Sequence, residues 1–181
     1  MNDQKFKKYI FNVISLLKMQ AFQAKENTDY LKINFKDYAE GMIMGYYSII
    51  TLFKHEAFAL CIDQRELGLS EIEPEKDLLG LHKHPDIPVQ EDNFSICPMT
   101  EENISGYLLD TIALLKEQAI EAKRDLENSK KDDFEYNRGH LMSYCAVFSL
   151  LKQQAWLFDV NQTEIGLDNL NPEIDLLYFE N

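Results

Sequence analysis

The chain contains 181 residues, of which 45% are hydrophobic and 12% are aromatic, and its formal net charge is −13. This composition is typical of a packed globular protein, with enough residues for one core or for two small cores that share an interface. Because an acidic surface repels phosphate backbones, the charge argues against DNA or RNA as a partner. It favours either a partner with a basic surface or high solubility alone.

Two amphipathic helical runs open the chain. Apolar and small residues recur at steps of three and four over 6–24 and again over 42–57, which is the spacing of one helix face. A connection of about 6–10 residues makes the two helices antiparallel neighbours. Gly41 lies inside the second run, where glycine costs about 1 kcal/mol relative to alanine, so we expect a close helix–helix approach near the turn. Tyr46 is expected to pack its ring at the edge of the core, and a ligand cavity beside the glycine is the alternative.

A compact tail follows the second run. The tripeptide Leu67-Gly68-Leu69 predicts the end of the helix, with glycine as its C-terminal cap and an apolar contact after it. Pro74 is suited to the first position of a short helical turn, and the leucines around it are expected to fold back onto the bundle. Four carboxylates of this tail are candidate partner-binding residues: Glu71, Glu73, Glu75 and Asp77.

Residues 80–99 contain three prolines and show no hydrophobic period, so we interpret them as a crossover linker. His82 and His84, followed by Asp86, form the cluster that most resembles a set of metal ligands. No other histidine or cysteine has suitable local spacing, and a solvated linker is therefore favoured over a metal site. We expect no bound metal and no cofactor.

The second half of the chain repeats the first. Shifting the sequence by 98 residues aligns 9–79 with 107–177 without a gap, and 26 of the 71 pairs are identical, whereas about 4 are expected from composition. Gly139 and Tyr144 repeat Gly41 and Tyr46, and these four are interpreted as structural residues. The second tail adds four candidate partner-binding carboxylates: Glu164, Asp168, Glu173 and Asp175.

The repeat predicts an all-α fold. We expect two tandem long antiparallel helical hairpins that pack as a four-helix bundle-like domain with short helical tails. The first hairpin and its tail occupy 1–79, the linker 80–99, and the second hairpin and its tail 100–181. The three segments are expected to form one compact unit.

One lysine recurs in a Φ-Φ-Lys-x-(Gln/Glu)-Ala box that is present in all four helical runs. We expect its stem to cover apolar surface while its ammonium group reaches water. These lysines are Lys18, Lys54, Lys116 and Lys152.

Cysteine usage and hydropathy indicate a cytoplasmic protein. Cys61, Cys97 and Cys145 form no C-x-x-C pair, which argues against a disulfide framework or a zinc knuckle. Cys61 and Cys145 fall in helical patterns and are interpreted as small core residues. The longest mostly apolar run, 42–53, is too short to cross a bilayer, and the N-terminal residues lead into an amphipathic helix rather than a signal peptide. We therefore expect no membrane partner.

Catalytic motifs are missing from the sequence. Glu40 corresponds to Arg138 in the second copy and His55 to Gln153, so neither candidate group is repeated. The chain contains no glycine-rich phosphate loop and no nucleophile elbow. We expect a protein that is not an enzyme.

The repeated pattern LLKxQAxxAK, G-x-x-M-x-Y and P-E-x-D-LL resembles that of small acidic helical proteins of bacteria and points to no particular family. Such proteins often act as inhibitors or immunity partners of toxins, which is an analogy of type. The leading hypothesis is a non-catalytic protein that occludes a basic toxin or nuclease through acidic patches. The alternatives are a small-molecule or metal-binding bundle with a cavity near the glycine and tyrosine layers, and a structural oligomeric subunit. The sequence leaves the oligomeric state open, with a homodimer as one option.

Overall fold

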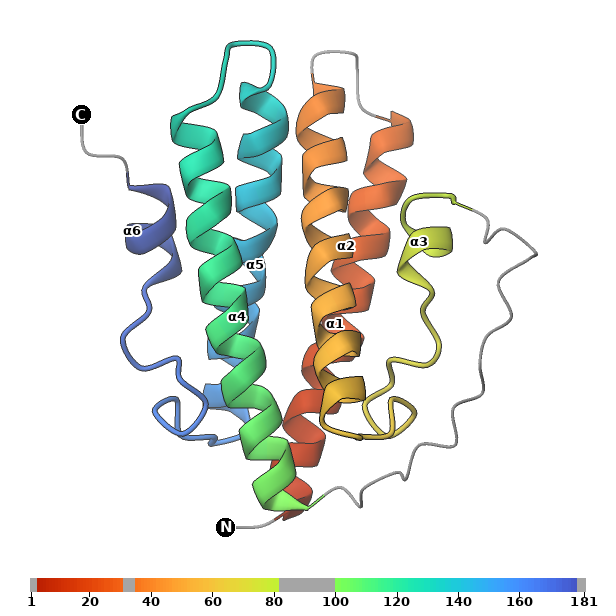
Figure 1. The fold of residues 1–181 in the computed structure, drawn as a ribbon, viewed down its shortest axis with the longest axis vertical. Coiled ribbons are helices and arrows are strands. Elements are labelled where there is room, and N and C mark those ends of the chain that lie inside the picture. Colours follow the sequence, from red (N-terminus) through yellow and green to blue (C-terminus); the bar gives the residue numbers. More distant parts are fainter. Residues whose placement is uncertain (1–2, 31–34, 82–99, 179–181) are drawn as a thin grey trace.

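The structure, a computed structural model, describes residues 3–30, 35–81 and 100–178, and this part of the chain is helical without a β-strand. The all-α prediction is therefore confirmed (Figure 1). The helices are α1 (Asp3–Tyr30), α2 (Lys36–Ala59), α3 (Pro74–Asp77), α4 (Glu101–Glu127), α5 (Phe134–Leu157) and α6 (Pro172–Leu177).

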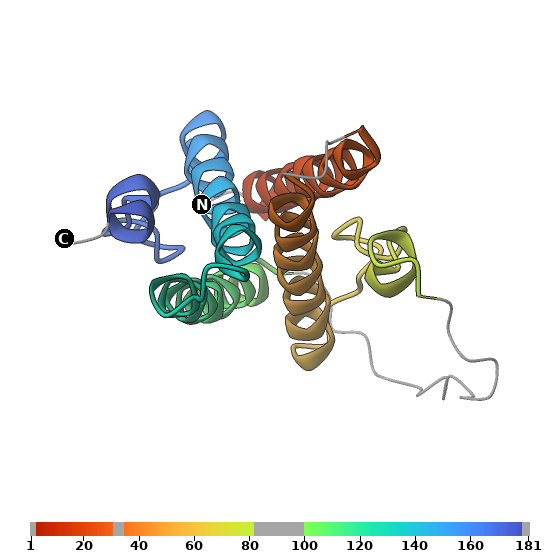
Figure 2. The same cartoon turned by 90° about the horizontal axis from the view of Figure 1, so that it is seen from above.

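The four long helices stand side by side. α1 and α2 run in opposite directions, as do α4 and α5, whereas α2 and α5 run parallel in the centre of the molecule (Figure 1; Figure 2). The most extensive contact between any two helices joins α2 to α5. The two halves of the sequence are thus related by an approximate two-fold axis between α2 and α5, along the helix direction.

Glycine allows α2 and α5 to touch. A Cβ atom on Gly41 would lie 2.0 Å from the backbone oxygen of Tyr136, and one on Gly139 would lie 1.9 Å from that of Tyr38. No side chain fits in that distance, so the repeated glycines bring two backbones into direct contact. The contact joins the two hairpins to each other rather than the two helices within one hairpin.

A single hydrophobic core runs through both repeats. Buried side chains from all four long helices and from both tails belong to one cluster. Two tyrosines cross between the hairpins at equivalent positions: the Tyr9 hydroxyl donates to the backbone oxygen of Leu151 at 3.3 Å, and the Tyr107 hydroxyl donates to that of Phe53 at 2.9 Å. Each bond satisfies a hydroxyl that burial has removed from water.

The second helix of each hairpin ends earlier than predicted. α2 ends at Ala59, and Cys61 follows with a positive φ of 56°, while the amide of Ile62 donates to the oxygen of Ala57 at 2.8 Å. This is a Schellman cap whose left-handed position is held by cysteine instead of the usual glycine. The prediction that Gly68 ends the helix is wrong, because Gly68 closes the turn that follows. Cys61 is accordingly half-buried beyond the helix end and is not a core residue.

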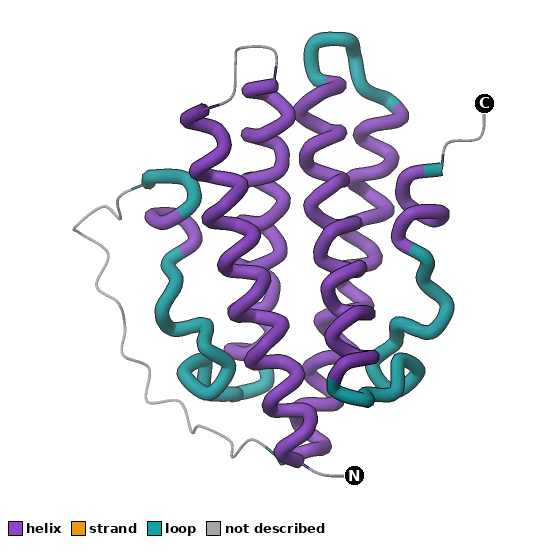
Figure 3. Tube along the Cα trace, turned by 180° about the vertical axis from the view of Figure 1, so that it is seen from behind, coloured by secondary structure: helices purple, strands orange, loops and turns teal. Residues whose placement is uncertain are grey.

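Each tail lies along the outer side of its own hairpin as a loop followed by one short helix (Figure 3). Pro74 and Pro172 occupy the first turns of α3 and α6, as predicted. Leu69 and Leu78 are buried, as are Leu167 and Leu176 in the second copy. The predicted docking of the tails onto the bundle is therefore confirmed.

The recurrent lysines bind backbone oxygens of the tails. The prediction that their ammonium groups reach water is therefore wrong. Lys18 Nζ donates to the Gly68 oxygen at 2.8 Å, and Lys54 Nζ donates to the Ile72 oxygen at 2.7 Å. The physical reason is that backbone carbonyls of an irregular segment docked on a core need donors, and a long side chain from the neighbouring helix supplies them. Lys116 and Lys152 make the equivalent bonds to Gly166 and Leu170 in the second copy.

Candidate functional site

The two acidic tails lie on opposite flanks of the molecule, separated by the four long helices (Figure 2). The eight candidate carboxylates therefore form two separate surfaces rather than one. We define the first acidic flank as residues 61–81 and the second acidic flank as residues 153–178.

On the first acidic flank, part of the charge is used within the fold. The Asp77 carboxylate accepts a hydrogen bond at 2.7 Å from the backbone amide of Glu73, the residue that precedes α3, and so reaches back to the start of this helix. Glu71 lies 3.0 Å from Lys18 Nζ in an ion pair. Arg65 pairs with Asp63 at 2.7 Å, so this flank carries basic side chains among its acidic ones.

The second acidic flank contains no lysine or arginine in its sequence. Glu164, Asp168 and Glu173 are exposed. Asp175 is also exposed, but its carboxylate accepts from the backbone amide of Asn171, the N-cap residue of α6, at 2.7 Å, as Asp77 does from Glu73 before α3. The structure therefore divides the four predicted residues into one structural carboxylate and three that face outward.

Three lysines lie behind the second acidic flank, whereas Lys5 Nζ pairs with the exposed carboxylate of Asp159 on the flank itself at 2.7 Å. Lys123 Nζ donates to the backbone oxygens of Asp175 at 2.9 Å and Tyr178 at 3.0 Å. Lys116 and Lys152 donate to other backbone oxygens of the same segment. These three lysines thus lie on the interior side of the tail, while Glu164, Asp168 and Glu173 face solvent.

Large apolar side chains are exposed on the same flank. Trp156 is 81% exposed and Leu157 is 63% exposed at the end of α5, and Ile174 is 61% exposed on α6. Trp156 is the single tryptophan of the chain, and exposed tryptophan is a frequent anchor of protein–protein interfaces. Sequence reasoning missed these residues, although the replacement of Phe58 in the first copy by tryptophan in the second was a visible signal.

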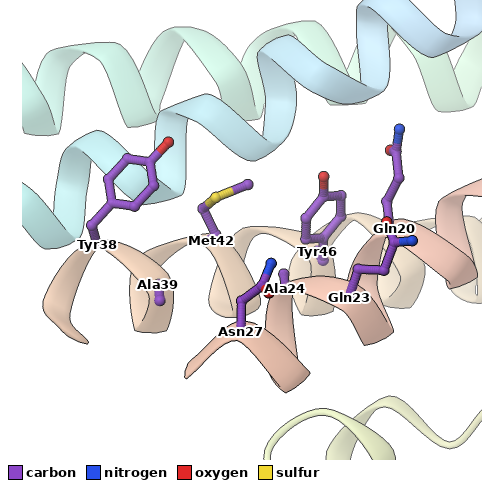
Figure 4. Close-up of a pocket in the computed structure, with 8 residues that line it drawn as sticks. All are labelled: Gln20, Gln23, Ala24, Asn27, Tyr38, Ala39, Met42 and Tyr46. Atoms are coloured by element: carbon purple, nitrogen blue, oxygen red, sulfur yellow. The ribbon is translucent and has the colours of Figure 1, made fainter. Parts of the chain in front are cut away.

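A pocket of about 260 Å³ opens between α1 and α2 near the turn of the first hairpin (Figure 4). One face of α1 and one face of α2 line it, and Tyr38 and Tyr46 stand at either end of Met42 in Figure 4. Ala24 and Ala39 are small and leave the space open. The lining residues are Gln20, Gln23, Ala24, Asn27, Tyr38, Ala39, Met42 and Tyr46.

The four predicted structural residues lie close to this level of the bundle and are buried. Burial raises the pKa of Tyr46 and of Tyr144 to about 12, so both hydroxyls stay protonated at neutral pH. Gly41 and Gly139 lie at the contact of α2 with α5, one turn from the pocket wall. The layer therefore combines the architectural role predicted for it with a cavity in the first hairpin.

His140 occupies in the second hairpin the place that Met42 occupies in the first. Its Nε2 atom is buried and has no hydrogen-bond partner within 3–30, 35–81 and 100–178. Burial lowers the pKa of His140, and the charges of Asp125 and Glu121 oppose this by raising it. The imidazole is therefore held mainly in its neutral form.

Metal and membrane sites are not found in the part of the chain that the structure describes. No group of three potential ligands converges among residues 3–30, 35–81 and 100–178. None of the helices described is long and apolar enough to cross a membrane. His82, His84 and Cys97 lie outside the described residues.

Comparisons with protein-family models, with curated proteins and with solved structures gave no match. The acidic flanks and the pocket are therefore interpreted from their own chemistry.

Proposed function

We propose that the chain is a non-catalytic binding protein that occludes a basic surface of another protein, most concretely as an immunity or inhibitor protein against a basic toxin or nuclease. The observation that carries this proposal is the polarity of the second acidic flank. Glu164, Asp168 and Glu173 face solvent, the sequence of the flank contains no basic residue, and Lys116, Lys123 and Lys152 donate to its backbone from behind.

The charge arrangement supports association with a basic partner. At physiological ionic strength, charges are screened beyond about 8 Å, so an approaching protein senses the outward carboxylates before the lysines that lie behind the tail. Such a surface accelerates encounter with a basic partner and rejects an acidic one. Because the effect is electrostatic, the association rate falls as salt is added.

The exposed apolar residues supply binding energy that the surface charges alone do not provide. Rim charges steer association, but most binding energy in protein complexes comes from a few buried aromatic or apolar anchors. Trp156 is the largest exposed apolar side chain of the second acidic flank, and Leu157 is exposed next to it. We assign Trp156 as the anchor, with Glu164, Asp168 and Glu173 as the steering charges.

The test is affinity capture of host proteins on the immobilised chain, followed by reconstitution with the purified partner. The native chain is compared with the variant Glu164→Gln/Asp168→Asn/Glu173→Gln. We expect a basic protein to be retained by the native chain and lost from the variant, and its activity to be inhibited at an equimolar ratio. In isothermal titration the affinity should fall steeply as salt is raised.

A matched variant on the first acidic flank, Glu71→Gln/Glu75→Gln, separates a specific surface from overall charge. It should leave binding largely intact, whereas Trp156→Ser should weaken it at least about tenfold if the indole is a hot spot. Equal losses from both neutralised flanks, or capture of no basic protein, would contradict the proposal.

A further inference from the structure

The pocket between α1 and α2 contains a buried hydrogen-bond acceptor without a donor. Gln20 Oε1 is almost completely buried and has no hydrogen-bond partner among the residues that the structure describes. In the second hairpin the equivalent Gln118 Oε1 accepts from the Tyr144 hydroxyl at 3.2 Å. The first hairpin contains the same pair, Gln20 and Tyr46, yet there the amide oxygen is left without the bond. An unpaired buried acceptor costs about 1–3 kcal/mol, so a ligand that donates to it is favoured.

The lining of the pocket is uncharged. Gln23 and Asn27 stand where the second hairpin has Glu121 and Asp125. The first hairpin therefore presents neutral amides at a level of the bundle where its duplicate presents carboxylates. A charged ligand would lose its hydration without gaining a counter-charge from the pocket walls.

The shape of the site restricts the ligand further. The volume of about 260 Å³ is below the range of about 300–1,000 Å³ that is usual for drug-sized ligands, which indicates a molecule of about a dozen non-hydrogen atoms. Tyrosine rings offer flat apolar walls, and side-chain amides pair in the plane of another amide or of a base edge. The Arg138 guanidinium packs on the Tyr38 ring, with its carbon 5.0 Å from the ring centre.

We propose that this pocket binds a small, uncharged, planar molecule that donates an N–H hydrogen bond to Gln20 Oε1, of the primary-amide or nucleobase kind. Gln20 is the recognition residue at depth, and Gln23 and Asn27 lie at the mouth. This site is on a different element from the acidic flanks and is independent of the protein-binding function.

The test is a titration of the isotope-labelled chain, followed by nuclear magnetic resonance of its side-chain amides, with nicotinamide, adenine and uracil as neutral probes. Nicotinate serves as the charged isostere of nicotinamide. We expect at least one neutral probe to shift the side-chain amide resonances of Gln20, Gln23 and Asn27 saturably, with a dissociation constant of about 1 mM or tighter. Nicotinate should bind at least about tenfold more weakly than nicotinamide.

Two matched variants locate the site. Gln20→Leu should abolish the shifts of the Gln23 and Asn27 resonances, and Gln118→Leu, which changes the equivalent residue of the second hairpin, should preserve them. Ala24→Leu fills the pocket without removing a polar group, so it should abolish binding in a chain that still folds. Absence of saturable shifts with all three neutral probes, equal binding of nicotinate, or equal losses from Gln20→Leu and Gln118→Leu would overturn the proposal.

Discussion

The contact between α2 and α5 offers a quantitative test of how the two repeats are held together. Replacing Gly41 or Gly139 by alanine adds one methyl group, and alanine favours the helix by about 1 kcal/mol over glycine. Against this gain, the new Cβ would lie 2.0 Å or 1.9 Å from a backbone oxygen of the facing helix. A carbon and an oxygen normally approach no closer than about 3.3 Å, so the helices must separate by about 1 Å.

That separation affects the whole of the most extensive helix contact in the molecule. A gap of about 1 Å forfeits up to about half of each dispersion contact across it, and overpacking usually costs about 1–3 kcal/mol. We expect Gly41→Ala and Gly139→Ala each to lower the free energy of unfolding by about 2 kcal/mol. The melting temperature should fall by about 4–8 °C for a chain of this size.

Urea denaturation followed by circular dichroism measures the effect, and Gly106→Ala is the control. Gly106 lies inside α4, and a Cβ there would meet nothing within 4 Å, so this variant should be stabilised by about 0.5–1 kcal/mol. The double variant Gly41→Ala/Gly139→Ala should lose less than the sum of the two single losses, because the first separation relieves the second. Stabilisation of all three single variants to a similar extent would refute the close contact.

Three further measurements probe the local features. Cys61→Gly should raise the free energy of unfolding by about 1 kcal/mol, because Cys61 has a positive φ that glycine adopts without strain; a lower melting temperature would contradict this. Lys116→Met keeps the apolar stem but leaves the Gly166 oxygen without its donor, so it should lower the free energy of unfolding by about 1–2 kcal/mol. Amide hydrogen exchange should become faster in 158–178 and should stay unchanged in 61–81. Burial lowers the folded-state pKa of His140, so below about pH 6.5 the unfolded chain binds a proton that the folded chain resists. The stability that neutral His140 contributes is thus lost as the pH falls below that value. The variant His140→Met should therefore lose stability less steeply than the native chain as acid is added. Identical profiles of stability against pH for the two proteins would refute this expectation.

The sequence by itself determined the helices, their duplication and the docking of the tails. Hydrophobic periodicity is local, and alignment of one half of the chain with the other reports which features both halves need. Pro74 and Pro172 marked the short helices for the same reason, since proline acts on the residues next to it. The acidic composition of the second tail also predicted the exposed carboxylates Glu164, Asp168 and Glu173.

Only the tertiary structure decided which helices meet and what each repeated residue touches. Gly41 indicated a close approach of two helices. The facing helix, however, is the equivalent helix of the other repeat, 98 residues further along the chain, and no local sequence pattern identifies it as the partner. The same holds for Lys18, whose ammonium group reaches a carbonyl 50 residues further along the chain. The cap at Cys61 was missed for a local reason, because cysteine holds a left-handed position at which the sequence signature of this cap is glycine.

The difference between the two halves likewise arises from packing. Gln20 and Gln118 are identical in sequence context, LLKxQA, yet one amide oxygen is bonded to a tyrosine and the other is not. Periodicity reports that a residue faces inward, because facing follows from the helical repeat. Whether its polar atom finds a donor depends on distances of a few tenths of an ångström between helices, and only the packed structure sets those distances.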